Sequence, residues 1–216
     1  MKTFMLNSLI ILLVLLVSCN EGSNEINKIE ALKIIEEPRF INEIETPKDF
    51  IRKETKSGSF GDFLVKLPLR DSNIVFLYNG QQKINQNAHF AVIDIDPGNA
   101  DLMQCADAIM RLRSEYLFQA ERINEIEFNF VSGDSYSYTN YLNGTTPVVR
   151  GNDVNWRTGN SRENTYSSLQ KYLRWIYSYS GTASLIHELQ EVGDIESLQI
   201  GDVFIQSKNP YGHAVI

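Results

Sequence analysis

Cys105 lies in the stretch "DLMQCADAIMRLRSEYL", residues 101–117, whose apolar spacing predicts a helix. Asp101 is suited to cap the start of that helix, which places Cys105 four residues inside it. The partial positive charge of a helix N-terminus, or a nearby imidazolium, stabilises a thiolate relative to a thiol. Cys105 is therefore a candidate nucleophile.

The same cysteine also fits a packing role. Cys105, Ile109, Leu112 and Tyr116 follow one another at spacings of four, three and four residues, which is one apolar stripe of a helix. Cysteine is among the residue types most often buried. A nucleophile on a buried central helix would show the same stripe, so the spacing leaves both roles open.

A nucleophilic cysteine needs a base, and the chain has three histidines. His187 lies in "LIHELQ", where its neighbours predict an ordinary surface position on a helix. His89 opens the apolar run "HFAVIDID", and His213 opens "HAVI". Both runs are predicted strands whose first residue can face a helix N-terminus, so His213 and His89 are the candidate bases.

Three motifs occur in an order that is similar to a known family. "QCADA" at a helix start, the Gly201-Asp202 pair in "LQIGDVFIQ" and the Gly-His pair that contains His213 resemble the NlpC-type branch of the papain-like cysteine hydrolases. The resemblance implies a papain-like fold, in which a central helix packs on an antiparallel sheet. It also implies Cys105 as nucleophile, His213 as general base and acyl transfer as the reaction.

The match to that family has two departures. Around the nucleophile this chain has Gln104-Cys105-Ala106-Asp107, where the family has Asp-Cys-Ser-Gly. Gln104 is the candidate side chain for a second oxyanion donor, beside the backbone N–H of Cys105; an exposed glutamine of the first turn is the alternative. The family's third polar residue follows the histidine on the next strand, so we expect the sequence to be a fragment that is truncated at its C-terminus after Ile216.

Nearly all of the mature chain also resembles an uncharacterised family of bacterial lipoproteins whose domain has no known function. The motifs that carry this resemblance are "FLYNG", "DIDPGNADLMQCADAIMRLRSEYL", "YSGTASL" and "GDVFIQ…GHAVI". The N-terminus agrees with a lipoprotein. Lys2 and a short apolar run precede "LVSC", which resembles the lipobox, so residues 1–18 are expected to be a signal peptide and Cys19 the lipid-attachment site.

If Cys19 carries lipid, Cys105 has no partner in the chain and is a free thiol in a compartment that permits disulfides. The formal net charge is −7, and loss of Lys2 with the signal peptide makes it −8. A net negative chain without a block of basic residues is a poor nucleic-acid binder. No pair of cysteines and histidines has zinc-site spacing, so neither a metal nor another cofactor is expected.

The predicted organisation is a signal peptide, a polar tether over residues 19–48, and one α+β domain over residues 49–216. Within the domain we expect helices after Ser59, after Asp101, from Ser161 to Gly181 and from 182 to 193, and a loop over 141–160. Strands are expected in a hairpin around Asn79-Gly80, over 126–130, and in a strand–turn–strand unit over 197–216.

These features predict a lipoprotein of the cell envelope, held on a bacterial membrane by lipid on Cys19. Its expected activity is hydrolysis of amide or peptide bonds, with peptidoglycan stem peptides as the substrate class that the resemblance implies. The alternative is a non-catalytic envelope lipoprotein that uses the same fold for binding or assembly, with Cys105 as part of its core.

Overall fold

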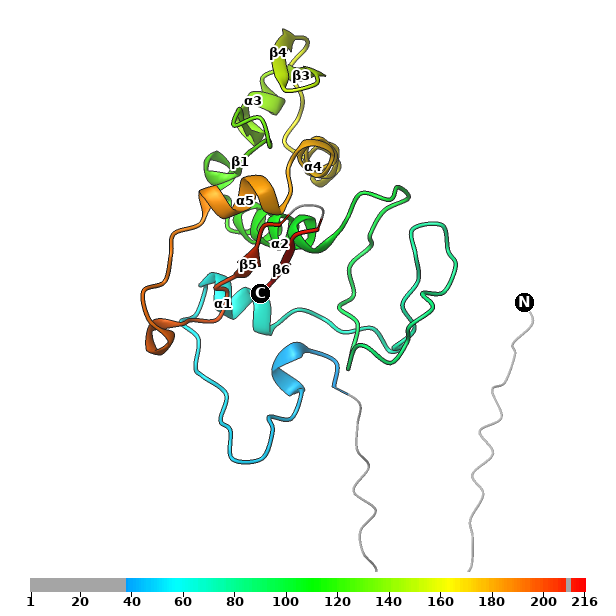
Figure 1. Cartoon of the computed structure of the whole chain (residues 1–216), viewed down its shortest axis with the longest axis vertical. Coiled ribbons are helices and arrows are strands. Elements are labelled where there is room, and N and C mark those ends of the chain that lie inside the picture. Colours follow the sequence, from blue (N-terminus) through cyan, green and yellow to red (C-terminus); the bar gives the residue numbers. More distant parts are fainter. Residues whose placement is uncertain (1–37, 209–210) are drawn as a thin grey trace, which may run out of the picture. The chain divides into compact units, whose positions relative to one another are not determined.

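A computed structural model describes residues 38–208 and 211–216 of the chain. Helices and short antiparallel strand pairs alternate along it, so the fold is mixed α and β (Figure 1). The α-helices are α1 Phe60–Val65, α2 Cys105–Gln119, α3 Tyr138–Leu142, α4 Tyr166–Tyr179 and α5 Thr182–Glu188. The strands are β1 Glu127–Asn129, β2 Ser135–Ser137, β3 Thr145–Arg150, β4 Asp153–Thr158, β5 Phe204–Gln206 and β6 His213–Val215. Three short 3₁₀ helices are η1 Ile41–Glu43, η2 Ile123–Glu125 and η3 Ile195–Ser197.

In the described residues the strands form three separate pairs rather than one sheet. β1 pairs with β2, β3 with β4 and β5 with β6, each antiparallel. The β5–β6 pair is the strand–turn–strand unit predicted at the end of the sequence. Its register sets Gln206 opposite His213 and Phe204 opposite Val215.

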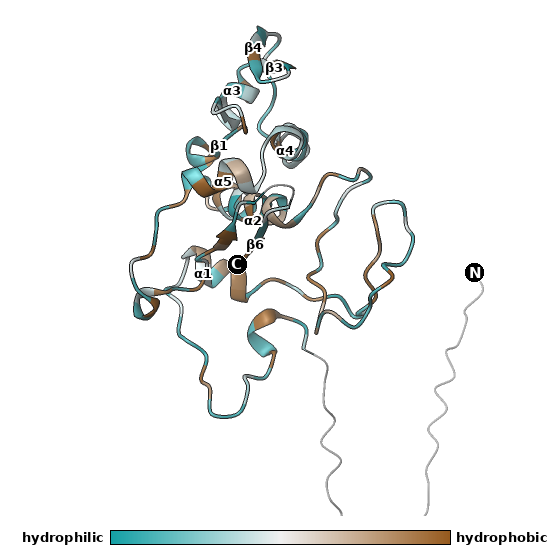
Figure 2. Cartoon of the chain, viewed as in Figure 1, coloured by the Kyte–Doolittle hydropathy of each residue, from teal (hydrophilic) through white to brown (hydrophobic). Residues whose placement is uncertain are grey.

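Helix α2 lies at the centre of the packing. It contacts α1, α4, η2 and β6, and Figure 1 shows β6 beside it. The hydrophobic β5 lies next to this contact (Figure 2). Ile109 and Met110 of α2 share one buried cluster with Ala214 of β6 and the buried face of α4. That face consists of Leu169, Tyr172, Leu173 and Ile176, which recur at helical spacing.

The structure confirms one predicted helix start and moves another. Ser59 caps α1 as expected, and its hydroxyl accepts from the N–H of Asp62. Helix α4, however, begins after Thr165, whose hydroxyl accepts from the N–H of Ser168 at 3.2 Å. The predicted cap Ser161 lies in the extended segment before it. Both residues are good caps, and the first buried residue of the face, Leu169, lies four residues after Thr165.

The segment predicted as a loop over 141–160 contains a hairpin instead. β3 and β4 pair over their full length, with Trp156 opposite Pro147 and Arg150 opposite Asp153. Gly151 adopts a φ of 62°, which closes the turn. The central Gly151-Asn152 pair marks the turn between the two strands, and the Gly and Asn residues at both ends of the segment favoured the loop prediction.

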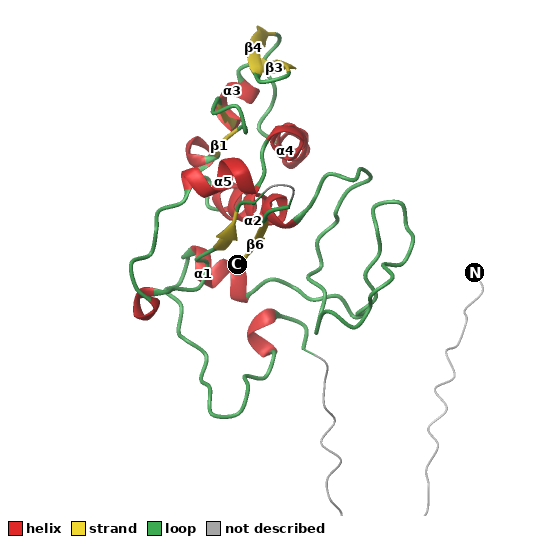
Figure 3. Ribbon diagram, in the orientation of Figure 1, coloured by secondary structure: helices red, strands yellow, loops and turns green. Residues whose placement is uncertain are grey.

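Residues 70–104, by contrast, contain less regular structure than predicted (Figure 3). The Asn79-Gly80 turn forms, and the N–H of Leu77 donates to Gln81 O at 2.7 Å. Its arms are joined only by the isolated bridge between Phe76 and Gln82. The predicted strand after His89 is likewise reduced to a single bridge, Leu69 to Ile93.

Residues before the predicted domain start contact the rest of the domain. The N–H of Ile41 donates to Leu67 O at 3.2 Å, and the N–H of Leu69 donates to Arg39 O at 2.7 Å. Ile41 packs against a second, smaller cluster of buried Leu64, Leu67 and Leu112. Residues 1–37, including the predicted signal peptide and Cys19, lie outside the described part. Within the described part no helix has the length and apolar character needed to cross a membrane.

Candidate functional site

Cys105 is the first residue of α2, and Gln104 is the N-cap. The sequence-based cap was wrong: Asp101 lies in a turn, three residues before Gln104. Residues 99–102 form bends and turns, with a bond from the N–H of Leu102 to Ala100 O, so helical backbone begins only after them. This shift places Cys105 closer to the N-terminal end of the helix than the sequence suggested. The unpaired N–H groups there give the helix end its partial positive charge.

The Cys105 side chain is only partly buried, and it forms no disulfide within the described residues. The other members of the predicted stripe, Ile109, Leu112 and Tyr116, are buried. These three side chains therefore pack in the core, while the thiol of Cys105 at the N-terminal end of the stripe retains some access to solvent. That position is compatible with a nucleophile.

His213 begins β6, and the neighbouring residue explains how the strand fits there. An added Cβ on Gly212 would overlap the hydroxyl of Thr182 at the start of α5 and would lie 2.9 Å from Gln206 O. A glycine is therefore required for β6 to pass α5 and pair with β5. Ala214 is buried toward α2, whereas His213 on the opposite side of the strand is exposed.

The Gly201-Asp202 pair forms the expected turn before β5. Gly201 has a φ of 104°, a conformation that favours glycine. The carboxylate of Asp202 accepts from the N–H of Gln199 at 2.8 Å, and the N–H of Asp202 donates to Gln199 O at 3.1 Å. Along the chain the structure therefore has, in this order, α2 beginning at Cys105, the Gly201-Asp202 turn, β5, and β6 beginning at His213.

The structure places the remaining predicted residues on three different segments. Nε2 of His89 is 2.5 Å from the carbonyl oxygen of Asn73, within the irregular segment. His187 is exposed on α5, as the sequence predicted. The Gln104 side chain is exposed at the start of α2, and its backbone N–H donates to Asp107 Oδ2 at 2.9 Å.

Sequence reasoning missed a buried acid in the first turn of α2. Asp107 is 5% exposed, and its second oxygen, Oδ1, is buried without a hydrogen-bond partner among the described residues. Burial raises the pKa of this carboxyl to about 6, against the lowering effect of the N–H groups of Gln104 and of Asp107 itself. Nothing in the motif "QCADA" indicated that the side chain of Asp107 would be buried.

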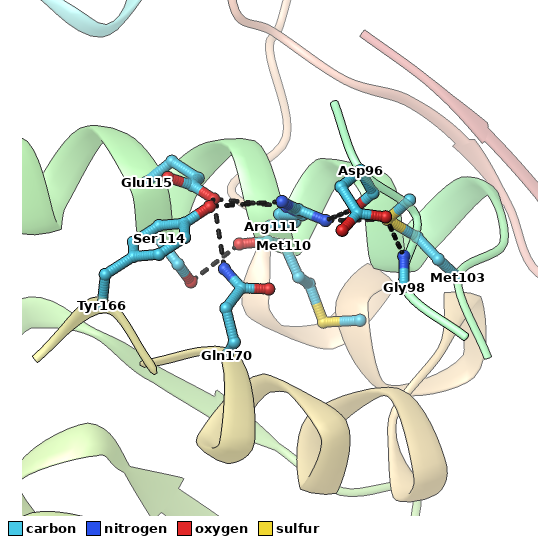
Figure 4. A network of polar contacts seen from close by, with 9 residues as sticks. All are labelled: Asp96, Gly98, Met103, Met110, Arg111, Ser114, Glu115, Tyr166 and Gln170. Carbon is cyan, nitrogen blue, oxygen red and sulfur yellow. Dashed lines mark hydrogen bonds and ion pairs between the residues drawn. The ribbon is translucent and has the colours of Figure 1, made fainter. Parts of the chain in front are cut away.

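A polar network on the next turns of α2 was also missed (Figure 4). Arg111 Nε is 3.3 Å from Glu115 Oε1, and both side chains are largely buried. The hydroxyl of Tyr166 donates to the same oxygen at 2.6 Å, and Gln170 Nε2 donates to it at 3.3 Å. Arg111 also bonds the carbonyl oxygen of Asp96. The opposite charges four residues apart on a helix were the available signal.

This network separates two pockets. A pocket of about 620 Å³ lies along α1 and α2, and its walls include Phe63, Leu112 and Tyr116. A pocket of about 230 Å³ lies beside α4 and residues 96–102. Arg111 and Tyr166 line both, and neither pocket is lined by Cys105 or His213.

No cluster of three or more histidine, cysteine or acidic side chains suited to a metal ion occurs among residues 38–208 and 211–216.

Comparison with known proteins gives one family. The model of a domain of unknown function, DUF4846, matches residues 41–216. No curated protein and no solved structure matches the chain.

Proposed function

We propose that this chain, which belongs to the DUF4846 family of unknown function, is a cysteine hydrolase of amide or peptide bonds. The observation that carries the proposal is the direct packing of α2, which begins at Cys105, against β6, which begins at His213. The partial exposure of Cys105 supports it, because a nucleophile must be reached by substrate.

The proposed reaction is acyl transfer to the Cys105 sulfur. This step requires the exposed His213 side chain to turn toward the start of α2, because the residue of β6 buried in the cluster shared with α2 is Ala214. His213 then takes the thiol proton, the thiolate attacks the carbonyl carbon, and the C–N bond breaks as the imidazolium protonates the leaving amine. Water, deprotonated by the same imidazole, then hydrolyses the thioester and restores the thiol. The N–H of Cys105 at the helix start is oriented to stabilise the oxyanion, with Gln104 as the second candidate donor.

We place this activity in the cell envelope, on a papain-like fold of the NlpC type. A lipid on Cys19, after removal of residues 1–18, would hold the protein on the membrane. Peptides are the substrate class, with peptidoglycan stem peptides as the first to be tried. The net negative charge of the chain argues against nucleic acid as a partner.

Alkylation of the thiol tests the proposal. The mature chain in detergent is treated with iodoacetamide at pH 6, and the peptide that contains Cys105 is quantified by mass spectrometry. We expect labelling at least tenfold faster than in the urea-unfolded chain, because proton removal by His213 would generate the more nucleophilic thiolate. His213→Ala should remove this advantage, and the exposed His187→Ala is the matched control.

Two outcomes would overturn the assignment. A rate equal to that of the unfolded chain, unaffected by His213→Ala, would contradict a hydrolase. Slower labelling in His89→Ala but not in His213→Ala would assign the role of base to His89 instead.

The second candidate function is a non-catalytic envelope lipoprotein that binds a ligand or partner. The pocket of about 620 Å³ along α1 and α2 favours it, because it lies away from Cys105 and combines aromatic walls with charged groups. Under this function Cys105→Ser leaves binding unchanged, whereas Phe63→Ala in the pocket wall weakens it.

A further inference from the structure

The pocket of about 620 Å³ along α1 and α2 has the size and the mixed lining of a small-molecule site. Its apolar wall contains Phe63 together with Leu67 and Leu112, which also belong to the smaller buried cluster. Polar side chains of α2, of the start of α4 and of residues 94–96 complete the lining. Neither Cys105 nor His213 takes part, so other residues determine what this pocket binds.

One oxygen of Glu115 is left open to a ligand. Oε1 accepts from three donors, which are Arg111 Nε at 3.3 Å, the Tyr166 hydroxyl at 2.6 Å and Gln170 Nε2 at 3.3 Å (Figure 4). Among the described residues no donor reaches Oε2, and Oε2 is not one of the buried polar atoms that lack a partner. Glu115 lines the larger pocket and not the smaller one. Because a carboxylate accepts on both oxygens, the network holds Glu115 in place and leaves Oε2 as an available acceptor.

The lining of this pocket is net negative. Its four carboxylates and two cations are Asp62, Asp94, Asp96, Glu115, Lys66 and Arg111, which give a formal net charge of −2. Each of the two cations pairs with one of these acids. Arg70, which lies outside the lining, pairs with Asp94 at 3.2 Å and reduces the net charge to −1. The remaining charge belongs to Asp96, whose Oδ1 accepts from the N–H of Gly98 at 2.9 Å and which has no ion-pair partner in the described part of the chain.

An anion does not suit this arrangement. The guanidinium of Arg111 has its donors directed at protein groups. Nε bonds the Glu115 carboxylate, Nη1 bonds the carbonyl oxygen of Asp96, and Nη2 bonds the Tyr166 hydroxyl. Lys66 is engaged in its own ion pair. A metal ion does not suit it either, because residues 38–208 and 211–216 contain no group of three side chains able to hold one. An open acceptor beside an unpaired carboxylate favours a ligand that has N–H donors and positive charge.

We propose that this pocket binds an ammonium group on an apolar stem, as found in a free alkylamine or in the side chain of a peptide lysine. The ammonium donates to Glu115 Oε2, and the charge of Asp96 balances it. The stem lies against the apolar wall that contains Phe63. Arg111 keeps the two acidic residues together, because it bonds both the Glu115 carboxylate and the backbone of Asp96. The inference is independent of the proposed hydrolase, and it rests on and specifies the ligand class of the second candidate function.

The experiment measures dissociation constants of matched probes for the mature chain in detergent, by ligand-observed NMR with empty micelles as the blank. The first probe is Nα-acetyl-lysine methylamide, and the second is its analogue in which a hydroxyl replaces the ammonium group. We expect the lysine probe to bind at least tenfold more tightly, because only the ammonium forms a charge-assisted bond in the pocket. Equal binding of the two probes, or tighter binding of Nα-acetyl-glutamate methylamide, would overturn the inference.

Asp96→Asn locates the site. Asparagine keeps an oxygen acceptor for the N–H of Gly98 and removes only the charge, so the dissociation constant of the lysine probe should rise threefold or more. Asp153→Asn is the matched control, because Asp153 is exposed on β4 and does not line the pocket. Glu115→Gln should raise the dissociation constant at least tenfold, and if this variant does not fold, Asp96→Asn decides the question. Equal effects of Asp96→Asn and Asp153→Asn would contradict a site in this pocket.

A further arm distinguishes the two sources of the ammonium group. Aminopentanol has an ammonium on a similar stem but no peptide groups. Binding at least as tight as that of the lysine probe would assign the pocket to a free amine, and binding threefold or more weaker would assign it to a peptide side chain.

Failure of this inference is distinguishable from failure of either candidate function. Cys105→Ser should leave the dissociation constants unchanged, and an altered value would place the probes at the proposed hydrolase site instead. A neutral or anionic probe that bound more tightly than the lysine probe, and lost affinity in Phe63→Ala, would retain the binding function and remove the preference for ammonium.

Discussion

At the scale of single residues, the proposed chemistry depends on side chains that begin secondary-structure elements. Cys105 opens α2 and His213 opens β6, so the backbone around each is fixed on one side by an element and on the other by a turn. The residue types themselves could be picked from the sequence, because cysteine and histidine are rare here. Asp107 could not, because burial of one acid among 27 acidic residues depends on how α4 packs.

Gly212 provides the first residue-scale prediction. Gly212→Ala places a methyl group against Thr182 and Gln206 O, and the overlap should cost about 1–3 kcal/mol in the free energy of unfolding. Because β6 must shift to relieve it, labelling of Cys105 should slow toward the rate seen in His213→Ala. Urea unfolding, followed by tryptophan fluorescence, measures the first effect, and iodoacetamide labelling measures the second.

Gly193→Ala is the matched control, since no atom lies within 4 Å of the added methyl group. Its free energy of unfolding should stay within about 0.5 kcal/mol of the wild type. If Gly212→Ala proved equally mild, the tight passage of β6 beside α5 would be wrong.

At the scale of elements, the sequence predicted best where it carried either a correct cap or a regular apolar face. Helix α1 follows its Ser59 cap, and α4 carries four buried residues at helical spacing. Hairpin β3–β4 was missed because it is amphipathic only weakly, with most of β4 exposed. The predicted strand after His89 has the right composition but gains only one bridge, because strand formation depends on a partner that local sequence does not specify.

The buried ion pair between Arg111 and Glu115 provides a prediction at the scale of elements, because it belongs to the contacts that hold α2 against its neighbours. Glu115→Ala leaves the guanidinium of Arg111 buried without its carboxylate, and this should cost about 3–5 kcal/mol. Glu125→Ala breaks the pair between Glu125 and Arg122, whose side chains are 49% and 43% exposed, and its cost should be far smaller because solvent screens the pair. Urea unfolding of the two variants compares these costs directly. Similar costs for both would mean that the Arg111 network does not anchor α2.

At the scale of the whole described domain, two hydrophobic clusters meet on α2. The larger joins α2 to α4 and β6, and the smaller joins α2 to α1 and to the chain around Ile41. Mixed helix and strand content was predictable from the alternation of periodicities. The separation into three strand pairs was not, because pairing across long loops is decided by packing among distant segments.

Ile41 tests whether the segment before residue 49 is part of the folded domain. Ile41→Ala removes a side chain that packs on Leu64 and Leu67, and it should lower the free energy of unfolding by about 1 kcal/mol. Ile51→Ala is the control, because Ile51 is 95% exposed and its truncation should have no measurable effect. Urea unfolding of both variants in the mature chain gives the comparison. Equal stability of the two variants would show that residues 38–48 act as a tether only. The expected difference would show that these residues belong to the folded domain, where they cover the smaller hydrophobic cluster beside the pocket of about 620 Å³.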